Sequence, residues 1–124
     1  MEFRRIHHVA IVHESGAPLL ATLAGTCGLE VDDTEDGPGF TERMWPVGES
    51  HLQTLEATGD GVVRRSVDAR GPGLHHIAFE VDDLNAALEG REVLIAPNSP
   101  SPGVLVAFVV DDGAPVELMQ IDDV

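Results

Sequence analysis

The sequence contains no lysine and no tyrosine, and it has a single cysteine, Cys27. The absence of lysine excludes chemistry that proceeds through a lysine Schiff base or amine nucleophile. One cysteine cannot form an intramolecular disulfide or build a cysteine-based zinc site. No apolar run approaches the roughly 18 residues of a membrane span, and the N-terminus lacks the apolar core of a signal peptide. We therefore expect a complete cytoplasmic protein without a membrane partner.

Positive charge is also scarce. Seven arginines stand against 22 acidic residues, which gives a formal net charge of −15. Such a chain repels phosphate polymers, so nucleic acid is a poor partner. A length of 124 residues and a hydrophobic content of 43% are typical of one globular domain.

Within this domain, residues 1–124, the sequence repeats itself. Short segments of the first half recur in the same order in the second half, which predicts two like modules over residues 1–58 and 73–124, joined by residues 59–72. The matching pairs are Ile6–Ile11 with Leu74–Phe79, Gly28–Val31 with Gly90–Val93, and Leu52–Leu55 with Val116–Met119.

Each module has the periodicity of a β-α-β-β-β unit. We expect an α+β fold in which paired βαβββ modules form a cupped mixed sheet with helices on one face. One helix begins near Pro18 and ends by Gly28, and another covers Leu84–Leu88 after an Asp82 or Asp83 N-cap. A proline-rich loop is expected at 96–103. The expected strands cover residues 5–12, 29–33, 41–47, 51–57, 74–81, 92–95, 104–110 and 115–121.

Four polar residues lie at corresponding positions of apolar strands. Strand side chains alternate between faces, so His8 shares a face with Ala10, and the larger Val9 and Ile11 point to the other face, where we expect the helices. The same alternation applies to the strands of the second module. If the modules pair symmetrically, four side chains converge on the face away from the helices: His8, Gln53, His76 and Glu117.

Two imidazoles, an amide oxygen and a carboxylate, with no thiolate, are a ligand set for a divalent ion such as Co²⁺, Ni²⁺, Mn²⁺ or Zn²⁺. Four protein ligands leave two octahedral positions for substrate oxygens. The alternative is that each histidine is a satisfied core or surface residue, that Gln53 is a polar residue of an edge strand, and that Glu117 is a carboxylate facing solvent.

These segments resemble the vicinal oxygen chelate superfamily, which includes glyoxalases, bleomycin resistance proteins and dioxygenases. Within it, the sequence is most similar to methylmalonyl-CoA epimerases. The resemblance extends over the whole chain and rests on four segments: Ile6–Val12, Cys27–Val31, Gly73–Leu84 and Val116–Met119.

The resemblance implies metal ligands at His8, Gln53, His76 and Glu117, and proton transfer at a carbon between two carbonyl groups, with a bound metal stabilising the enolate. Glu117 would be one acid or base. The epimerases carry a second glutamate before their third strand, where this sequence has Gly37. We assign that role to Glu35, with Asp36 and Glu42 as alternatives.

An acyl-CoA substrate would bring phosphates, which the cluster Arg64, Arg65 and Arg70 could bind, unless these are solvated surface arginines. We also expect a homodimer. Three other functions compete with an epimerase. The first is a glyoxalase I-like lyase that acts on a thiol adduct. The second is a ring-cleaving dioxygenase, but a fourth protein ligand argues against it. The third is a non-catalytic antibiotic-binding protein, which would not need the four ligands.

Overall fold

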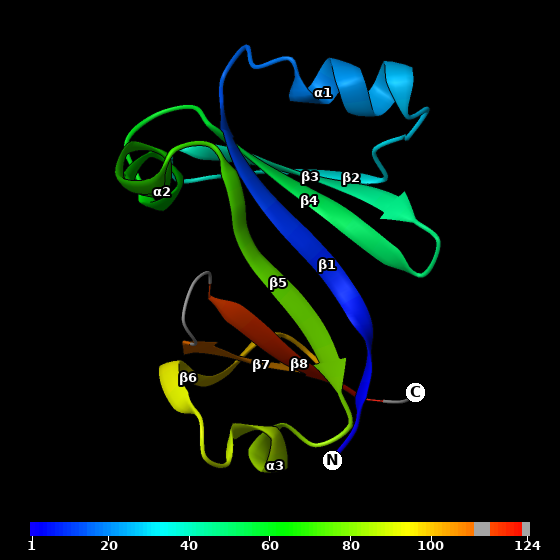
Figure 1. Cartoon of the computed structure of the whole chain (residues 1–124), viewed down its shortest axis with the longest axis vertical. Coiled ribbons are helices and arrows are strands. Elements are labelled where there is room, and N and C mark those ends of the chain that lie inside the picture. Colours follow the sequence, from blue (N-terminus) through cyan, green and yellow to red (C-terminus); the bar gives the residue numbers. More distant parts are fainter. Residues whose placement is uncertain (111–114, 123–124) are drawn as a thin grey trace. The chain divides into compact units, whose positions relative to one another are not determined.

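A computed structural model describes residues 1–110 and 115–122 (Figure 1). The chain divides into two compact units, Val9–His75 and Met1–His8 with His76–Val124. The strands β1 (Phe3–Glu14) and β5 (Gly73–Val81) contribute residues to both units. Among the described residues, eight strands are hydrogen-bonded in the order β2-β3-β4-β1-β5-β8-β7-β6, which confirms the α+β fold with a mixed sheet. The division into modules 1–58 and 73–124 remains a prediction.

The unit Val9–His75 contains an antiparallel meander of β2 (Asp33–Gly37), β3 (Phe40–Val47) and β4 (Ser50–Ala57). The turn between β2 and β3 depends on Gly39, whose φ is +78°. A Cβ at this position would collide with the Asp60 carbonyl oxygen, so the turn requires glycine both for its left-handed backbone and for its close approach.

Two helical segments belong to this unit. The first is α1 (Leu19–Ala21), which continues as the π-helical turn η1 (Thr22–Thr26), after Pro18 as expected. The second is α2 (Val62–Arg70), which lies in the stretch 59–72, where we expected only a connection between the modules.

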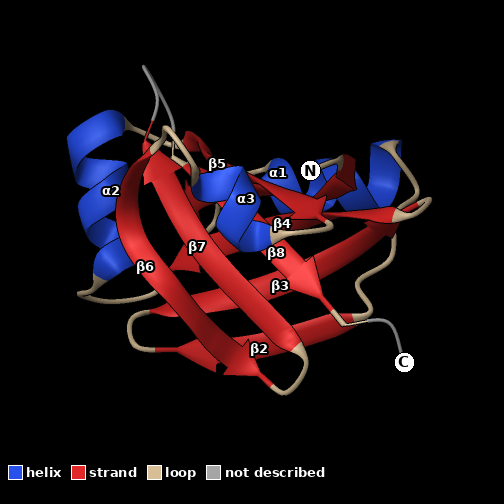
Figure 2. Ribbon diagram, turned by 90° about the horizontal axis from the view of Figure 1, so that it is seen from below, coloured by secondary structure: helices blue, strands red, loops and turns tan. Residues whose placement is uncertain are grey.

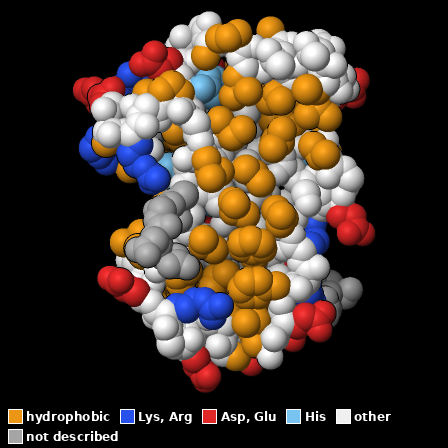
Figure 3. Space-filling view, in the orientation of Figure 1, with side chains coloured by type: hydrophobic (Ala, Val, Ile, Leu, Met, Phe, Trp, Pro, Cys, Tyr) orange, Lys and Arg blue, Asp and Glu red, His pale blue; other side chains and the backbone are white. Residues whose placement is uncertain are grey.

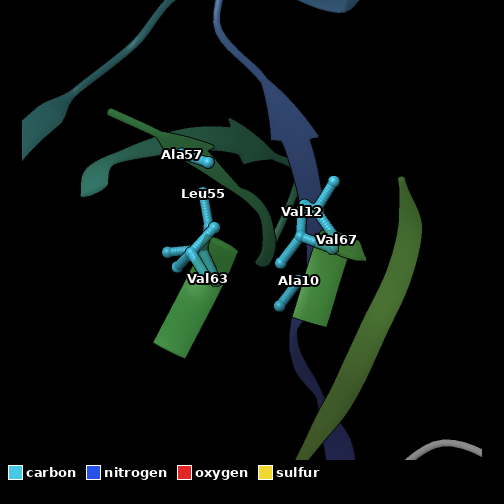
Figure 4. Packing of buried hydrophobic residues seen from close by; sticks show 6 residues of the cluster. All are labelled: Ala10, Val12, Leu55, Ala57, Val63 and Val67. Atoms are coloured by element: carbon cyan, nitrogen blue, oxygen red, sulfur yellow. The ribbon is translucent and has the colours of Figure 1, made fainter. Parts of the chain in front are cut away.

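The position of α2 contradicts the prediction of which face of β1 is covered by helices. Val63 and Val67, one helical turn apart, point toward apolar side chains of β1 and β4 (Figure 4). The cluster consists of Ala10, Val12, Leu55, Ala57, Val63 and Val67. The helix therefore covers the Ala10 face of β1, whereas we expected helices to cover the Val9 and Ile11 face. The prediction was wrong because it did not include a helix in the connecting stretch.

The unit Met1–His8 with His76–Val124 contains parts of β1 and β5, followed in the sheet order by β8 (Val116–Ile121), β7 (Val104–Val110) and β6 (Glu92–Ser101). β5 and β8 are parallel, whereas β7 pairs with β8 and β6 pairs with β7 in antiparallel fashion. The short helix α3 (Leu84–Leu88) lies over one face of these strands (Figure 2). The Asp83 carboxylate caps it as expected, accepting a hydrogen bond from Ala86 N at 3.1 Å.

The two faces of this sheet have separate cores. Leu84 and Ala87 of α3 pack against Val81, Val109 and Leu118 on one face. Ala78, Val106 and Met119 form a cluster on the other. In β8, Leu118 faces α3, so Glu117 and Met119 face away from it.

Two predicted segments differ from the structure. The strand expected at 29–33 lies at Asp33–Gly37, and the proline-rich stretch expected as a loop belongs to β6, which runs to Ser101. The pairing of β6 with β7 shifts register at several points, which allows an edge strand to accommodate prolines. Ser99 Oγ donates to the Val104 carbonyl at 2.7 Å. In the ranges 1–110 and 115–122, no helix is long and apolar enough to cross a bilayer.

Candidate metal centre

Three of the four predicted metal ligands lie together in one unit. His8 is on β1, His76 on β5 and Glu117 on β8, which are neighbouring strands. His8 Nε2 lies 3.1 Å from His76 Nε2, and Glu117 Oε1 lies 3.2 Å from His8 Nε2 and 3.3 Å from His76 Nε2. All three residues are buried, with the glutamate 9% exposed. We refer to them as the His8–His76–Glu117 triad.

The spacing of the triad fits a divalent cation. Bonds from such an ion to nitrogen or oxygen ligands are about 2.1 Å long, so adjacent ligand atoms lie about 3.0 Å apart around an octahedral ion and about 3.4 Å around a tetrahedral one. The three observed separations fall between these values. Two imidazole lone pairs and a carboxylate would repel one another at this distance without a proton or a cation between them. The residues therefore fit a metal ion.

A neighbouring histidine holds His8 in place. His7 Nδ1 lies 2.8 Å from His8 Nδ1. If His8 Nε2 offers its lone pair to a cation, its proton sits on Nδ1 and is donated to His7 Nδ1. Such an outer hydrogen bond fixes the tautomer and the ring orientation of a metal-binding histidine. Phe108 contacts His76 edge to face, with ring centroids 5.3 Å apart.

The charge of Glu117 follows from its two imidazole neighbours. Burial alone would raise its pKa, but hydrogen bonds from His76 and His8 outweigh burial and lower the pKa of Glu117 to about 2. The side chain is therefore a carboxylate at neutral pH, so the triad would offer a metal ion one negative charge together with two imidazole nitrogens. That is a suitable charge for a divalent ion that must retain Lewis acidity.

The fourth predicted ligand, Gln53, belongs to the unit Val9–His75. It is half-buried on β4, directly across from Met44 of β3. Its role as a ligand remains a prediction from the sequence repeat.

Strand register distinguishes the three candidates for a second acid or base. Glu35 is directly across from Glu42, and the pairings of β3 with β4 place both on the same sheet face as Gln53. Asp36 is on the opposite face, where it accepts a hydrogen bond from Thr41 Oγ1 at 2.7 Å. Glu35 and Glu42 therefore share the face of the predicted ligand, and Asp36 does not.

The three arginines assigned to phosphate binding are all on α2. Arg64 forms ion pairs with Glu14 at 3.1 Å and Asp68 at 3.3 Å. Arg65 and Arg70 are exposed. A phosphate would have to compete for Arg64 with two carboxylates, so the two exposed arginines are better placed to bind one.

Sequence reasoning missed one residue near the triad. Strand alternation turns the Cβ of His7 away from the His8 face, yet its ring nitrogen reaches His8. The adjacent pair His7–His8 in the sequence was the available signal.

Comparisons with known proteins show which family the chain resembles. A family model described as "Glyoxalase/Bleomycin resistance protein/Dioxygenase superfamily" matches residues 7–93. The chain is 31% identical over 87 residues to an ethylmalonyl-CoA/methylmalonyl-CoA epimerase of Cereibacter sphaeroides. That match covers 67% of this chain and 65% of the relative, so it spans slightly less than two thirds of the curated relative.

Solved structures share the fold over nearly the full length. A methylmalonyl-CoA epimerase in complex with methylmalonyl-CoA and NH4+ has a TM-score of 0.79 and 30% identity, covering 99% of this chain and 98% of its own. A hypothetical protein from Bacillus halodurans C-125 has a TM-score of 0.81 at 23% identity, covering 97% and 96% of the two chains, which shows the fold alone.

Proposed function

The chain belongs to the Glyoxalase/Bleomycin resistance protein/Dioxygenase superfamily, and we propose that it is a metal-dependent epimerase that moves the α-proton of a methylmalonyl-CoA-like thioester. The observation that carries this proposal is the buried triad, in which three potential ligand atoms lie 3.1 to 3.3 Å apart. The similarity to epimerases supports the choice of substrate class.

In this proposal His8, His76 and Glu117 hold a divalent ion, with Gln53 as the fourth ligand. When bound, the ion would supply positive charge beside the two substrate carbonyl oxygens, where negative charge develops as the α-proton leaves. His7 keeps His8 in the tautomer that can bind a cation. Phe108 packs edge to face against the His76 ring.

Inversion at the α-carbon needs one group to remove the proton and a second to return it on the other side. We assign these roles to Glu117 and Glu35. Glu117 is held ionised by its two histidine neighbours, so it can accept a proton only weakly. Glu42, directly across from Glu35, is the alternative second group.

A coenzyme A ester would bind through its phosphates to Arg64, Arg65 and Arg70. Because Arg64 already pairs with two carboxylates, we assign the larger share of phosphate binding to Arg65 and Arg70.

The test is proton NMR in D₂O, with methylmalonyl-CoA and protein loaded in turn with Co²⁺, Ni²⁺, Mn²⁺ and Zn²⁺. We expect the α-proton signal to disappear through exchange. Replacing an acid–base group should slow exchange about 10²-fold or more, so Glu35→Gln and Glu42→Gln identify the second group. Asp36→Asn, on the opposite face, is the matched control.

The ligand assignment has its own readout. Glu117→Gln and His76→Ala should each reduce the metal content measured by elemental analysis, with the fold retained by circular dichroism. Full metal occupancy in either variant overturns the ligand assignment. If the wild-type protein with every metal leaves the α-proton in place, the epimerase proposal is rejected, and turnover of a thiol adduct instead would favour the lyase.

A further inference from the structure

A cavity opens where α3 ends. The helix has five residues, about one and a half turns, so it covers only part of the apolar sheet face beneath it. Beyond its end lies a cavity of about 340 Å³, at the small end of the range for ligand sites. Its lining residues all belong to one unit of the chain: Phe3, Phe79, Gly90, Arg91, Glu92, Val109, Val110, Val116 and Leu118.

The cavity lies across the sheet from the His8–His76–Glu117 triad. Leu118 follows Glu117 on β8 and points to the opposite face. Val116 shares that face with Leu118, and Phe79 packs with them in the α3 core. The cavity is therefore separate from the proposed metal centre, and nothing in the proposed epimerase reaction uses it.

The walls offer an apolar surface for a flat or branched group. Phe3 and Phe79 stack with ring centroids 5.4 Å apart, and Phe3 is 43% exposed although it is a large hydrophobic residue. Val109, Val116 and Leu118 provide aliphatic walls. In the region of α3, Figure 3 shows hydrophobic side chains gathered beside a cationic one. An exposed apolar surface of this kind gains free energy when a ligand covers it.

One cation faces this apolar surface. The Arg91 guanidinium carbon lies 5.8 Å from the centre of the Phe3 ring, and Arg91 Nη1 donates to the Ala87 carbonyl. Within the part of the chain that the structure describes, no carboxylate forms an ion pair with Arg91, although acidic residues outnumber arginines by 22 to 7. Its remaining N–H groups are donors available to an anion.

We propose that this cavity binds a small carboxylic acid with an aromatic ring or a branched alkyl group. The carboxylate would accept hydrogen bonds from Arg91, which can bind it in bidentate fashion. The apolar group would lie against Phe3 and the aliphatic wall. Because Glu92 also lines the cavity, a dicarboxylate would be disfavoured.

The test is a two-dimensional ¹H–¹⁵N NMR titration of the full chain with 3-phenylpropanoate, and in parallel with the uncharged 3-phenylpropanol. For the acid we expect saturable shifts at the amides of Arg91, Val109 and Leu118, with a Kd of about 1 mM or tighter. The alcohol should bind at least about tenfold more weakly, because it lacks the charge that Arg91 recognises.

Variants separate the two parts of the site. Arg91→Gln should weaken the acid about tenfold and leave the alcohol unchanged, whereas Phe3→Ala should weaken both. Arg4→Gln, at an exposed arginine that does not line the cavity, is the matched control and should leave both affinities unchanged. Equal affinities of acid and alcohol, an acid affinity insensitive to Arg91→Gln, or the absence of saturable shifts would each overturn the proposal.

Discussion

Glu56 on β4 shows how single charged side chains support this acidic chain. Its carboxylate is 14% exposed and accepts hydrogen bonds from Arg43 Nη1 at 2.8 Å and from Ser15 Oγ at 2.9 Å. The hydrogen bond from Arg43 is the main reason why the pKa of Glu56 lies below its ordinary value of 4.5. A group whose pKa is lower in the folded than in the unfolded state stabilises the fold above the unfolded-state pKa.

This gives a pH-dependent prediction. Glu56→Gln should lower the free energy of unfolding by about 1 to 3 kcal/mol at pH 7, because a charged hydrogen bond is lost. The difference in unfolding free energy between the variant and wild type should shrink as the pH falls below 4.5. It should be smallest below the folded-state pKa of Glu56, where the wild-type carboxyl is protonated too. Urea denaturation at pH 7 and pH 3 measures both values. The exposed Glu30→Gln is the control, and equal losses at the two pH values would contradict the prediction.

The triad was predictable at the residue level because the strand pleat fixes which side chains share a face. His76 and Glu117 could be assigned to one face from alternation and the repeat alone, and the structure brings them together with His8. His7 could not be placed in this way. Alternation fixes the direction of a Cβ atom, but it does not determine how far the ring nitrogen reaches. The participation of Gln53 and Glu35 stays a prediction.

At the scale of elements, segments with strong local sequence signals were predicted correctly. The run Val104–Val110 was expected at the same bounds, and α3 was expected from its aspartate cap and its glycine stop. The helix α2 was missed because Val63 and Val67 are its only buried residues, which is too weak a pattern to recognise before the partner surface is known. The prolines of β6 indicated a loop, but bulges let the edge strand continue through them.

The cap of α3 carries a prediction at this scale. Asp83→Ala should destabilise the protein by about 1 kcal/mol, because the Ala86 N–H loses its acceptor while Leu84 and Ala87 stay packed in the core. Asp83→Asn keeps a capping oxygen and should retain most of the stability. Urea unfolding followed by circular dichroism compares the two variants. Equal destabilisation by alanine and asparagine would show that the cap contributes nothing.

Over the whole molecule, most of the charge is unbalanced. Ion pairs connect arginines to acids that are distant in the sequence, such as Arg5 with Glu80 and Arg43 with Glu56. Even if every arginine were paired, 15 acidic charges would remain. Repulsion among like charges destabilises a compact state, and it weakens with ionic strength because the Debye length falls from about 30 Å at 0.01 M salt to about 8 Å at 0.15 M.

Thermal stability should therefore rise with monovalent salt. We expect the melting temperature at pH 7 to increase by about 2 to 6 °C between 10 mM and 300 mM NaCl, corresponding to about 1 kcal/mol of relieved repulsion. The double variant Glu30→Gln/Asp33→Asn reduces the net charge from −15 to −13. It should melt higher than wild type at 10 mM NaCl and respond less to added salt. Surface ion pairs have the opposite effect, because salt weakens their attraction and so lowers stability. Each exposed ion pair contributes little, however. A melting temperature that falls steadily with NaCl would mean that these attractive pairs, rather than the excess of acid, dominate the electrostatics of the fold.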